Sequence, residues 1–194
     1  FLCDSGGQYK YGTTDVTRTI CFSKPKPYIK NIFTKILKGH IAVANTNLKK
    51  DYYGNKIDAR ARKFLKKSNL DYSHGTGHGV GFFLNVHEGP QSISKYNQSK
   101  FYPGMILSNE PGYYKKGKFG IRIENLVFVK QKTNHLSFED LTLIPIDKSL
   151  IEKKMLNKKE IDWLNNYHKK VYSKLKKFMN SYQLEDLKKS CSNI

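Results

Sequence analysis

Residues 2–19 read LCDSGGQYKYGTTDVTRT, and this stretch decides how the first part of the chain folds. Its three glycines make a turn-rich connection between two segments that can form strands, which predicts a β-hairpin. Asp4 and Asp15 lie on either side of the turn. Their separation can place them opposite one another in the hairpin, with Cβ atoms about 5 Å apart. Two carboxylates so close repel unless a cation lies between them, so the hairpin indicates a cation site.

A second pair of acids repeats this arrangement. Glu110 and Glu124 flank residues 111–123, PGYYKKGKFGIRI, whose midpoint is Gly117. A hairpin that turns there sets the two glutamates face to face, and the period of two puts Arg122 on the same face as Glu124. A single acid in a hairpin is most often a solvated charge. Two symmetric pairs within apolar strands favour a site instead.

Three histidines lie close together in residues 74–90, HGTGHGVGFFLNVHEGP. The glycines of this stretch exclude a stable helix, so it is predicted to be loop and strand. His74, His78 and His87 can then line one cleft. The pattern differs from the HExxH helix of zinc proteases, because no glutamate follows the first histidine. A lone histidine among glycines would usually be structural, but three beside four paired acids indicate a site.

This set of side chains predicts a metal centre. Four carboxylates with one or two imidazoles suit two divalent ions, such as Mn, Co, Fe or Zn, held about 3.5 Å apart by bridging carboxylates. A water shared by two such ions is acidified enough to supply hydroxide near neutral pH. The predicted reaction class is therefore hydrolysis.

Two helices are expected before the histidine cluster. Residues 27–45 carry apolar side chains at three- and four-residue spacing and are entered through two prolines, Pro25 and Pro27, which predicts an amphipathic helix. A second helix is predicted to begin after Asp58 as its N-cap and to bury Ala61, Phe64 and Leu65. With the strands, these helices give an α+β fold class.

The composition changes near residue 148, because all 14 glycines precede it. We therefore expect a division into residues 1–147 and a helical C-terminal extension, residues 148–194. Apolar residues of the extension alternate three and four apart, as in a heptad seam. The seam indicates either a helix that packs on its own domain or a subunit contact, and His168 within it is interpreted as a packing residue rather than a ligand. The seam residues are Ile161, Leu164, His168, Val171, Leu175, Phe178 and Tyr182.

Composition and charge exclude several classes of protein. The 194 residues, 38% hydrophobic and 13% aromatic, suffice for one folded domain. No apolar run approaches the ~18 residues of a membrane span. The net charge of +19 would suggest nucleic-acid binding, but the basic residues are almost all lysine, whereas arginine makes the bidentate phosphate and base contacts. We therefore expect neither a nucleic-acid nor a membrane partner.

The cysteines and the first residue give two further expectations. Three cysteines without a CxxC pair indicate neither a disulfide framework nor a thiolate zinc site, so a reducing compartment is expected. Cytoplasmic localisation follows, with a vacuolar or other vesicular pool as the alternative. The chain opens at Phe1 rather than Met, which indicates a piece of a longer protein.

Together, the strings LCDSGGQYKYGTTDVTRT, HGTGHGVGFFLNVHEGP, LSNEPGYY and GIRIEN resemble the Xaa-Pro aminopeptidase (aminopeptidase P) family, in the superfamily of creatinase, prolidase and methionine aminopeptidase. The resemblance covers roughly residues 1–147. The strings LTLIPID and EIDWLNNYHKK resemble the C-terminal extension of the eukaryotic cytosolic-type enzymes. The resemblance implies a "pita-bread" fold, N-terminally incomplete here, and a homodimer formed through the extension.

The resemblance also implies an activity and a set of metal ligands. Asp4, Asp15, His78, Glu110 and Glu124 would bind two divalent ions, most often manganese, with Asp15 and Glu124 bridging both. The implied reaction is hydrolysis of the N-terminal Xaa-Pro bond by a metal-bridging hydroxide, in peptides with proline at the second position. Family members carry upstream domains, so this fragment is expected to need the upstream part of the same protein and to be inactive alone.

Four further roles come from the resemblance. Glu110 would shuttle a proton from the attacking water to the proline nitrogen. His87 would hydrogen-bond the scissile carbonyl, and His74 would seat the proline side of the substrate. Arg122 would orient the second shell around the ligands.

Two other functions stay open at this stage. A non-catalytic pita-bread binding module would have other residues at the ligand positions, and none is replaced. A lysine-driven nucleic-acid binder would lose affinity steeply with salt and would not respond to chelators.

Overall fold

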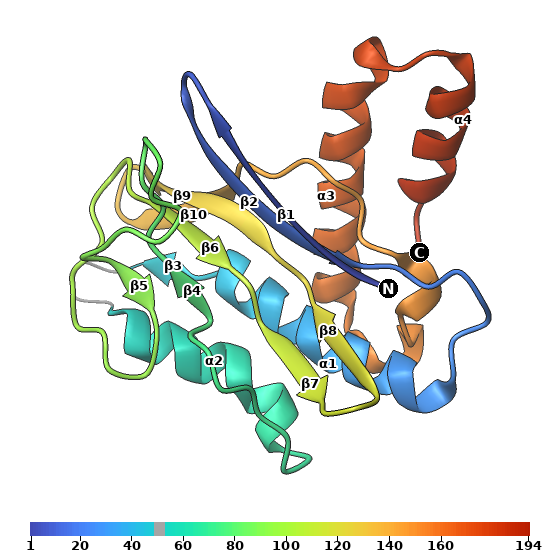
Figure 1. Ribbon diagram of the computed structural model, residues 1–194, viewed down its shortest axis with the longest axis horizontal. Coiled ribbons are helices and arrows are strands. Elements are labelled where there is room, and N and C mark those ends of the chain that lie inside the picture. Colours follow the sequence, from blue (N-terminus) through green and yellow to red (C-terminus); the bar gives the residue numbers. More distant parts are fainter. Residues whose placement is uncertain (49–52) are drawn as a thin grey trace.

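The computed structural model describes residues 1–48 and 53–194 (Figure 1). A long antiparallel hairpin opens the chain, and a helix follows it that runs beneath the strands of the central sheet. That helix, α1, contacts strands β6, β7, β8 and β10 and also helices α2 and α3. The first elements are β1 (Leu2–Tyr9), β2 (Gly12–Thr19), α1 (Pro27–Ala44), β3 (Asn47–Leu48) and α2 (Gly54–Lys66).

The strands pair in antiparallel fashion. The larger sheet has the order β3-β10-β9-β6, and separate pairs are formed by β1 with β2, β4 with β5 and β7 with β8. The remaining strands are β4 (Gly77–His78), β5 (Ser92–Ile93), β6 (Ile106–Asn109), β7 (Gly112–Lys115), β8 (Phe119–Arg122), β9 (Asn125–Gln131) and β10 (Leu136–Asp140).

The first hairpin forms as predicted, but its register differs from the expectation. Asp4 lies opposite Thr17, and Asp15 lies opposite Gly6. The prediction that the two aspartates face each other directly is therefore wrong. The turn is centred between Lys10 and Tyr11, and moving a turn centre by one residue moves each cross-strand partner by two. Because side chains alternate with a period of two, both aspartates still lie on one face.

The second hairpin has the predicted register. Gly112 pairs with Arg122 on one side of the glutamates, and Asn109 pairs with Asn125 on the other. The same register continued between these pairs sets Glu110 opposite Glu124. Gly117 lies at the centre of the turn with a φ of 68°, a left-handed conformation that glycine adopts without strain.

The amphipathic helix predicted for residues 27–45 is confirmed as α1, which begins at Pro27 and ends at Ala44. Proline at the first helical position fits because that position needs no hydrogen-bonded N–H. The buried face of α1 includes Ile32, Ile36 and His40.

The second helix starts earlier than predicted. α2 begins at Gly54, so Asp58 lies inside the helix and is not its N-cap. Asp58 is buried, and its Oδ2 accepts a hydrogen bond from the Nε of Arg62 at 2.8 Å. Ala61 and Leu65 are buried as expected, whereas Phe64 is only half-buried. The expected loop and short strands between the helix and Pro90 are confirmed.

The C-terminal part is helical, but the heptad seam is interrupted. α3 ends at Leu175, a 3-10 turn follows, and α4 begins again at Ser181, where Asn180 and Gln183 form a capping box. Phe178 and Tyr182 are consequently exposed, so a single continuous stripe was a wrong prediction. The elements here are the 3-10 turns Lys148–Leu150, Lys153–Met155 and Lys176–Phe178, with α3 (Lys158–Leu175) and α4 (Ser181–Ser190).

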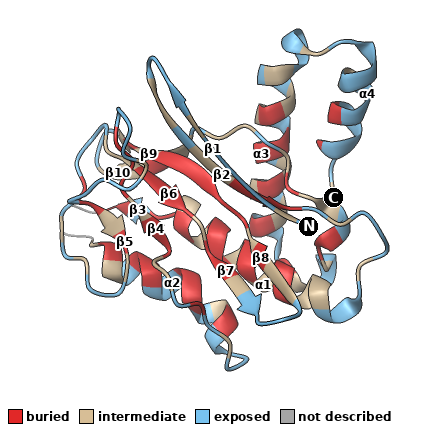
Figure 2. Cartoon of the chain, in the orientation of Figure 1, coloured by how far each residue is buried: buried red, intermediate tan, exposed pale blue. Residues whose placement is uncertain are grey.

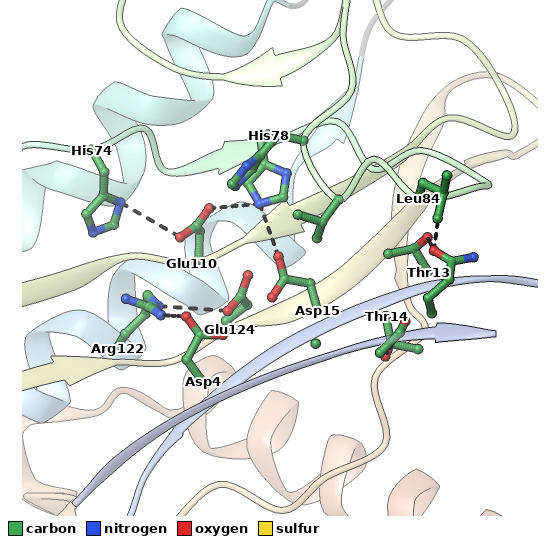
Figure 3. Close-up of a pocket in the computed structure, with 15 residues that line it drawn as sticks. Asp4, Thr13, Thr14, Asp15, His74, His78, Leu84, Glu110, Arg122 and Glu124 are labelled. Carbon is green, nitrogen blue, oxygen red and sulfur yellow. Dashed lines mark hydrogen bonds and ion pairs between the residues drawn. The ribbon is translucent and has the colours of Figure 1, made fainter.

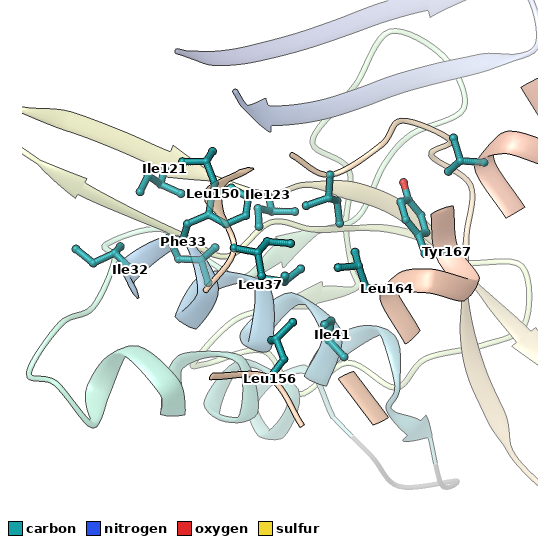
Figure 4. Close-up of a cluster of buried hydrophobic side chains, with 14 of the residues drawn as sticks. Ile32, Phe33, Leu37, Ile41, Ile121, Ile123, Leu150, Leu156, Leu164 and Tyr167 are labelled. Carbon is teal, nitrogen blue, oxygen red and sulfur yellow. The ribbon is translucent and has the colours of Figure 1, made fainter. Parts of the chain in front are cut away.

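The first half of the seam packs on its own domain. Leu164 and Val171 of α3 join a cluster with Ile32 and Leu37 of α1. Figure 4 shows Leu164 facing Leu37 in this cluster. Figure 2 shows buried residues on the facing sides of α1, α3 and the central strands, while the tip of the first hairpin is exposed. The division at residues 147 and 148 stays a prediction, and side chains from both sides of it share this core.

His168 is a buried packing residue, as interpreted. Its Nε2 accepts a hydrogen bond from the backbone N–H of Ile146 at 3.1 Å. Among the described helices, none has the length and apolar character of a membrane-spanning segment.

Candidate metal centre

One cleft gathers the side chains that the sequence analysis assigned to a metal or substrate site. It has a volume of about 610 Å³ and lies where the first hairpin, the histidine segment and the second hairpin meet (Figure 3). Its lining includes the eight predicted residues, Asp4, Asp15, His74, His78, His87, Glu110, Arg122 and Glu124. Their roles remain predictions, but their proximity is a property of the fold.

Three of these residues form the tightest group. Asp15 from β2, His78 from β4 and Glu124, which follows β8, bring one potential ligand atom each to within 4.8 Å of one another. The Nε2 of His78 lies 3.3 Å from Asp15 Oδ2 and 3.4 Å from Glu110 Oε1. Glu110 therefore borders the group directly.

The orientation of the His78 ring suits a metal ligand. Its Nδ1 lies 2.9 Å from the carbonyl oxygen of Gly79, so this nitrogen must carry the hydrogen and donate it. The lone pair of Nε2 is then directed at the carboxylates, as is usual for metal-binding histidines. Burial alone would lower the pKa of His78, but the Asp15 carboxylate, the Gly79 carbonyl and Glu110 outweigh it and raise the pKa.

The buried carboxylates of the cleft repel one another. Burial, reinforced by the charges of Glu110 and Asp15, raises the pKa of Glu124 to about 7. Burial also raises the pKa of Glu110, although His78, Ser108 and Arg122 partly oppose it. Oxygen and imidazole donors held together at this energetic cost suit divalent Mn, Co, Fe or Zn, because a cation removes the repulsion.

Asp4 lies at the edge of the group. Its side chain is about half exposed and forms an ion pair with the Nη2 of Arg122. The register explains this position, because the pair that contains Asp4 lies two residue pairs away from the pair that contains Asp15 along the hairpin. Figure 3 shows its carboxylate between Arg122 and Glu124.

Two hydroxyl groups that the sequence analysis missed hold the glutamates. Ser108 Oγ donates to Glu110 Oε1 at 3.0 Å and accepts the backbone N–H of His78 at 2.9 Å. Thr17 Oγ1 donates to Glu124 Oε2 at 2.5 Å and accepts the Nε hydrogen of Arg122 at 2.9 Å. Each hydroxyl lies two residues from a predicted ligand in the same strand or its extension, so the period of two could have identified it.

His74 forms a chain of hydrogen bonds with Tyr114, also missed, and Arg122. Its Nδ1 donates to the carbonyl of Gly75 at 2.7 Å, so its Nε2 accepts from the Tyr114 hydroxyl at 2.8 Å. That hydroxyl in turn accepts from Arg122 Nη1 at 3.0 Å. Burial lowers the pKa of His74, which keeps its ring neutral near pH 7.

Helix α2 fixes the backbone beside His74. Arg62 donates through Nη2 to the His74 carbonyl at 2.5 Å and through Nη1 to the Tyr72 carbonyl at 2.7 Å. Its partner Asp58 accepts the hydroxyl of Thr76 at 2.6 Å. The Asp58 misread as a helix cap therefore supports the histidine segment.

His87 lies at the exposed mouth of the cleft. Its ring makes an angle of 76° with that of His78, with centroids 4.2 Å apart. The loop before it is tied to the first hairpin, because Leu84 N donates to Gln8 Oε1 at 2.9 Å. His87 can thus reach a molecule bound beside His78.

Comparison with known proteins identifies the family. The sequence profile of metallopeptidase family M24 matches residues 1–131, and the profile of the C-terminal region of peptidase M24 matches residues 134–194. The chain belongs to metallopeptidase family M24. The resemblance to Xaa-Pro aminopeptidases is thereby confirmed at the level of the family.

Individual relatives point the same way. The chain is 47% identical to a probable Xaa-Pro aminopeptidase P of Sclerotinia sclerotiorum over 195 residues, which cover 95% of this chain and 32% of the relative. It is 46% identical to that of Laccaria bicolor over 207 residues, covering 100% of this chain and 32% of the relative. The chain thus spans about a third of the length of these relatives.

A solved structure confirms the predicted α+β pita-bread fold for the part that the chain spans. This is the X-prolyl aminopeptidase of Caenorhabditis elegans, described as a cytosolic enzyme with a di-nuclear active site. It superimposes with a TM-score of 0.94 at 41% identity and covers 100% of this chain and 33% of its own.

Proposed function

We propose that the protein to which this M24 chain belongs is an Xaa-Pro aminopeptidase, a metallo-exopeptidase that removes the first residue from peptides with proline in second place. The observation that carries the proposal is the convergence of Asp15, His78 and Glu124, with Glu110 beside them, in one cleft. The names of the relatives support the substrate class.

The metal ligands are proposed as Asp4, Asp15, His78, Glu110 and Glu124, with Asp15 and Glu124 shared by two ions. The raised pKa of Glu124 and the lone pair of His78 directed at the carboxylates support this assignment. Manganese is the proposed metal. Two divalent ions, when bound, acidify a water molecule and polarise the scissile carbonyl.

Glu110 moves the proton in this proposal. Its carboxylate takes a proton from the attacking water and delivers it to the proline nitrogen as the peptide C–N bond breaks. Burial raises the pKa of Glu110, which favours a group that must hold a proton briefly at neutral pH. Ser108 fixes one carboxylate oxygen and leaves the other directed toward His74.

His87 and His74 bind the substrate on either side of the bond. His87 donates a hydrogen bond to the carbonyl oxygen, where negative charge develops. His74 seats the proline side, and the rings of Tyr72 and Tyr114, whose centroids lie 4.9 Å and 5.4 Å from that of His74, pack against its ring. Arg122 orients Asp4, Thr17 and Tyr114 around the ligands.

The test is hydrolysis of Arg-Pro-Pro by the full-length protein. We expect release of arginine, loss of activity after metal stripping, recovery with added manganese, and little cleavage of Arg-Ala-Ala. Absence of turnover at full metal occupancy would reject the peptidase and favour the non-catalytic binding module. Steep salt-dependent binding of DNA without any effect of chelators would favour the nucleic-acid alternative instead.

The upstream part of the same protein is proposed to complete the cleft, so that residues 1–194 are inactive alone. The chain spans about a third of its relatives, and large side chains are exposed at the tip of the first hairpin and in the loop before His87, including Tyr9, Tyr11, Phe82, Phe83 and Leu84. We place the protein in the cytoplasm, on the likeness to the cytosolic C. elegans enzyme.

A homodimer through the C-terminal extension is also proposed, and the exposed Phe178 and Tyr182 support it. Replacing both by serine in the full-length protein is expected to halve the sedimenting mass, because a subunit contact would lose its apolar anchors. Tyr96→Ser, which changes another exposed tyrosine, serves as the control. An unchanged mass in the double variant would contradict this interface.

A further inference from the structure

Arg18 is a buried cation directly behind the cleft. It follows Thr17 on β2, and the period of two turns its side chain away from the face that carries Asp15 and Thr17. Only 5% of the residue is exposed. Burying a guanidinium is costly unless each donor finds a partner, so its surroundings indicate what it holds in place.

One side of the guanidinium fastens the backbone of Glu124. The Nη1 group donates to the Glu124 carbonyl at 2.6 Å and to the Thr17 carbonyl at 2.9 Å. The Glu124 N–H donates to the same Thr17 carbonyl at 3.1 Å, while the Thr17 hydroxyl holds the Glu124 carboxylate. Residues 17 and 18 therefore fix Glu124 at its N–H, its carbonyl and its side chain.

The other side of the guanidinium reaches the C-terminal region. Nη2 donates to the Ile144 carbonyl at 2.7 Å, to the Asn125 side-chain oxygen at 2.7 Å and to the Tyr167 hydroxyl of α3 at 2.9 Å. Nε donates to the Pro145 carbonyl at 3.1 Å.

Tyr167 is itself well fixed. Its ring stacks on that of Trp163, with an interplanar angle of 4° and centroids 5.4 Å apart. Because its hydroxyl accepts from Arg18, the hydroxyl hydrogen is available to the Ile144 carbonyl at 2.9 Å. Tyr167 thus holds both Arg18 and one of the carbonyls to which Arg18 donates. Figure 4 shows its ring beside Leu164 in the core.

We propose that Arg18 is a positioning residue for Glu124 and that Tyr167 holds Arg18, so that helix α3 supports the metal site. The inference rests on the proposed function, in which Glu124 is a ligand shared by two ions. The planar guanidinium has five N–H donors in fixed directions and can join these six acceptors if one Nη2 hydrogen is shared between two of them, whereas a lysine ammonium has only three donors and cannot.

The first test is Arg18→Lys in the full-length, metal-stripped protein, with Mn²⁺ as the titrant. The lysine side chain keeps the positive charge but lacks the planar arrangement of N–H donors that the guanidinium has. We expect the affinity for Mn²⁺ to fall by about 10- to 100-fold, the usual effect of losing a partner that orients a ligand. An affinity equal to that of the wild type overturns the proposal.

A second readout separates positioning from general stability. A purely structural arginine would lower the melting temperature equally with and without Mn²⁺. A positioning residue also reduces the rise in melting temperature that Mn²⁺ produces, because that rise depends on the affinity of the folded state. The same rise in Arg18→Lys and wild type overturns the proposal.

Tyr167→Phe tests the contribution of α3. This variant should fold because its ring remains stacked on Trp163, so it replaces Arg18→Lys as the test if that variant does not fold. Its matched control is Tyr172→Phe, since Tyr172 lies five residues later on α3, about 140° around the helix axis. We expect Mn²⁺ affinity about three- to tenfold weaker in Tyr167→Phe than in the control, a smaller effect than for Arg18 because Tyr167 acts through it. Equal affinities overturn the link to α3.

The outcomes distinguish this inference from the proposed function. A wild-type protein that binds no Mn²⁺ contradicts the metal centre itself. A wild-type protein that binds Mn²⁺, with variants that bind it equally well, contradicts only the role of Arg18 and Tyr167.

Discussion

Glu110→Gln in the full-length protein is expected to lower kcat for Arg-Pro-Pro by about 10²- to 10⁴-fold, the usual contribution of a positioned acid or base. The amide has nearly the same shape as the carboxylate, and its oxygen can still accept the hydrogen bond that Ser108 donates to Glu110. It cannot take a proton from water at neutral pH. The measurement is kcat at saturating Mn²⁺, with the bound metal counted by elemental analysis.

Two comparisons make the Glu110 result decisive. Glu139→Gln changes a glutamate of β10 that pairs with Lys130 away from the cleft, and it should leave kcat unchanged. The metal should remain bound in Glu110→Gln because Asp15, His78 and Glu124 still converge. Wild-type turnover by a fully metallated Glu110→Gln protein would remove the proton-shuttle role.

The two hairpins show what a strand pattern can and cannot specify. The register around Glu110 and Glu124 could be predicted because Gly117 marks one turn centre and an apolar face fixes the alternation. The first hairpin offers several glycines, and most of β1 is exposed. Register is weakly specified where no face is buried, so the turn could not be placed to within one residue.

The misplaced start of α2 has a different cause. An aspartate before an apolar helical pattern is a common N-cap, and the local pattern at Asp58 fits that reading. Its actual partners include Thr76, far along the chain, and Arg62, which in turn holds the His74 carbonyl. These contacts depend on how α2 packs against the histidine segment. The local sequence pattern around Asp58 contains no information about that packing.

Some of the residues that support the ligands could be predicted from the sequence, and others could not. Ser108 lies two residues from Glu110, and Thr17 lies two residues from Asp15, so strand alternation was sufficient to find both. Arg18 could not be found so, because its partners come from other parts of the chain. Alternation places Tyr114 on the same face as Glu110, but its contact with His74 depends on how the second hairpin packs against the histidine segment. The eight cleft residues were accessible to sequence reasoning because each carries a charge or an imidazole.

The buried histidines should make the protein sensitive to acid. Burial, with a smaller effect of Lys148 and Arg18, lowers the pKa of His168 to about 4, and burial with Arg18 lowers that of His40 to about 3. In the unfolded chain both imidazoles titrate near 6.5. Below that pH the unfolded state therefore binds more protons than the native state, and the free energy of unfolding falls as the pH falls.

The range of pH follows from these values. The contribution of His168 is fully present above about pH 6.5, decreases as the pH falls, and is exhausted near pH 4, where the native ring also becomes protonated. A shift from 6.5 to about 4 corresponds to roughly 3 kcal/mol. His40 continues the loss to about pH 3.

His168→Gln isolates one histidine from the acid response of the whole protein. The amide oxygen can accept the Ile146 N–H that His168 Nε2 accepts, and the side chain stays neutral at every pH. Between pH 7 and pH 4 the variant should therefore lose roughly 3 kcal/mol less unfolding free energy than the wild type. His135→Gln, in the turn between β9 and β10, controls for the loss of an imidazole. If denaturant titrations give His168→Gln the same dependence on pH as the wild type, the seam histidine does not contribute to acid unfolding.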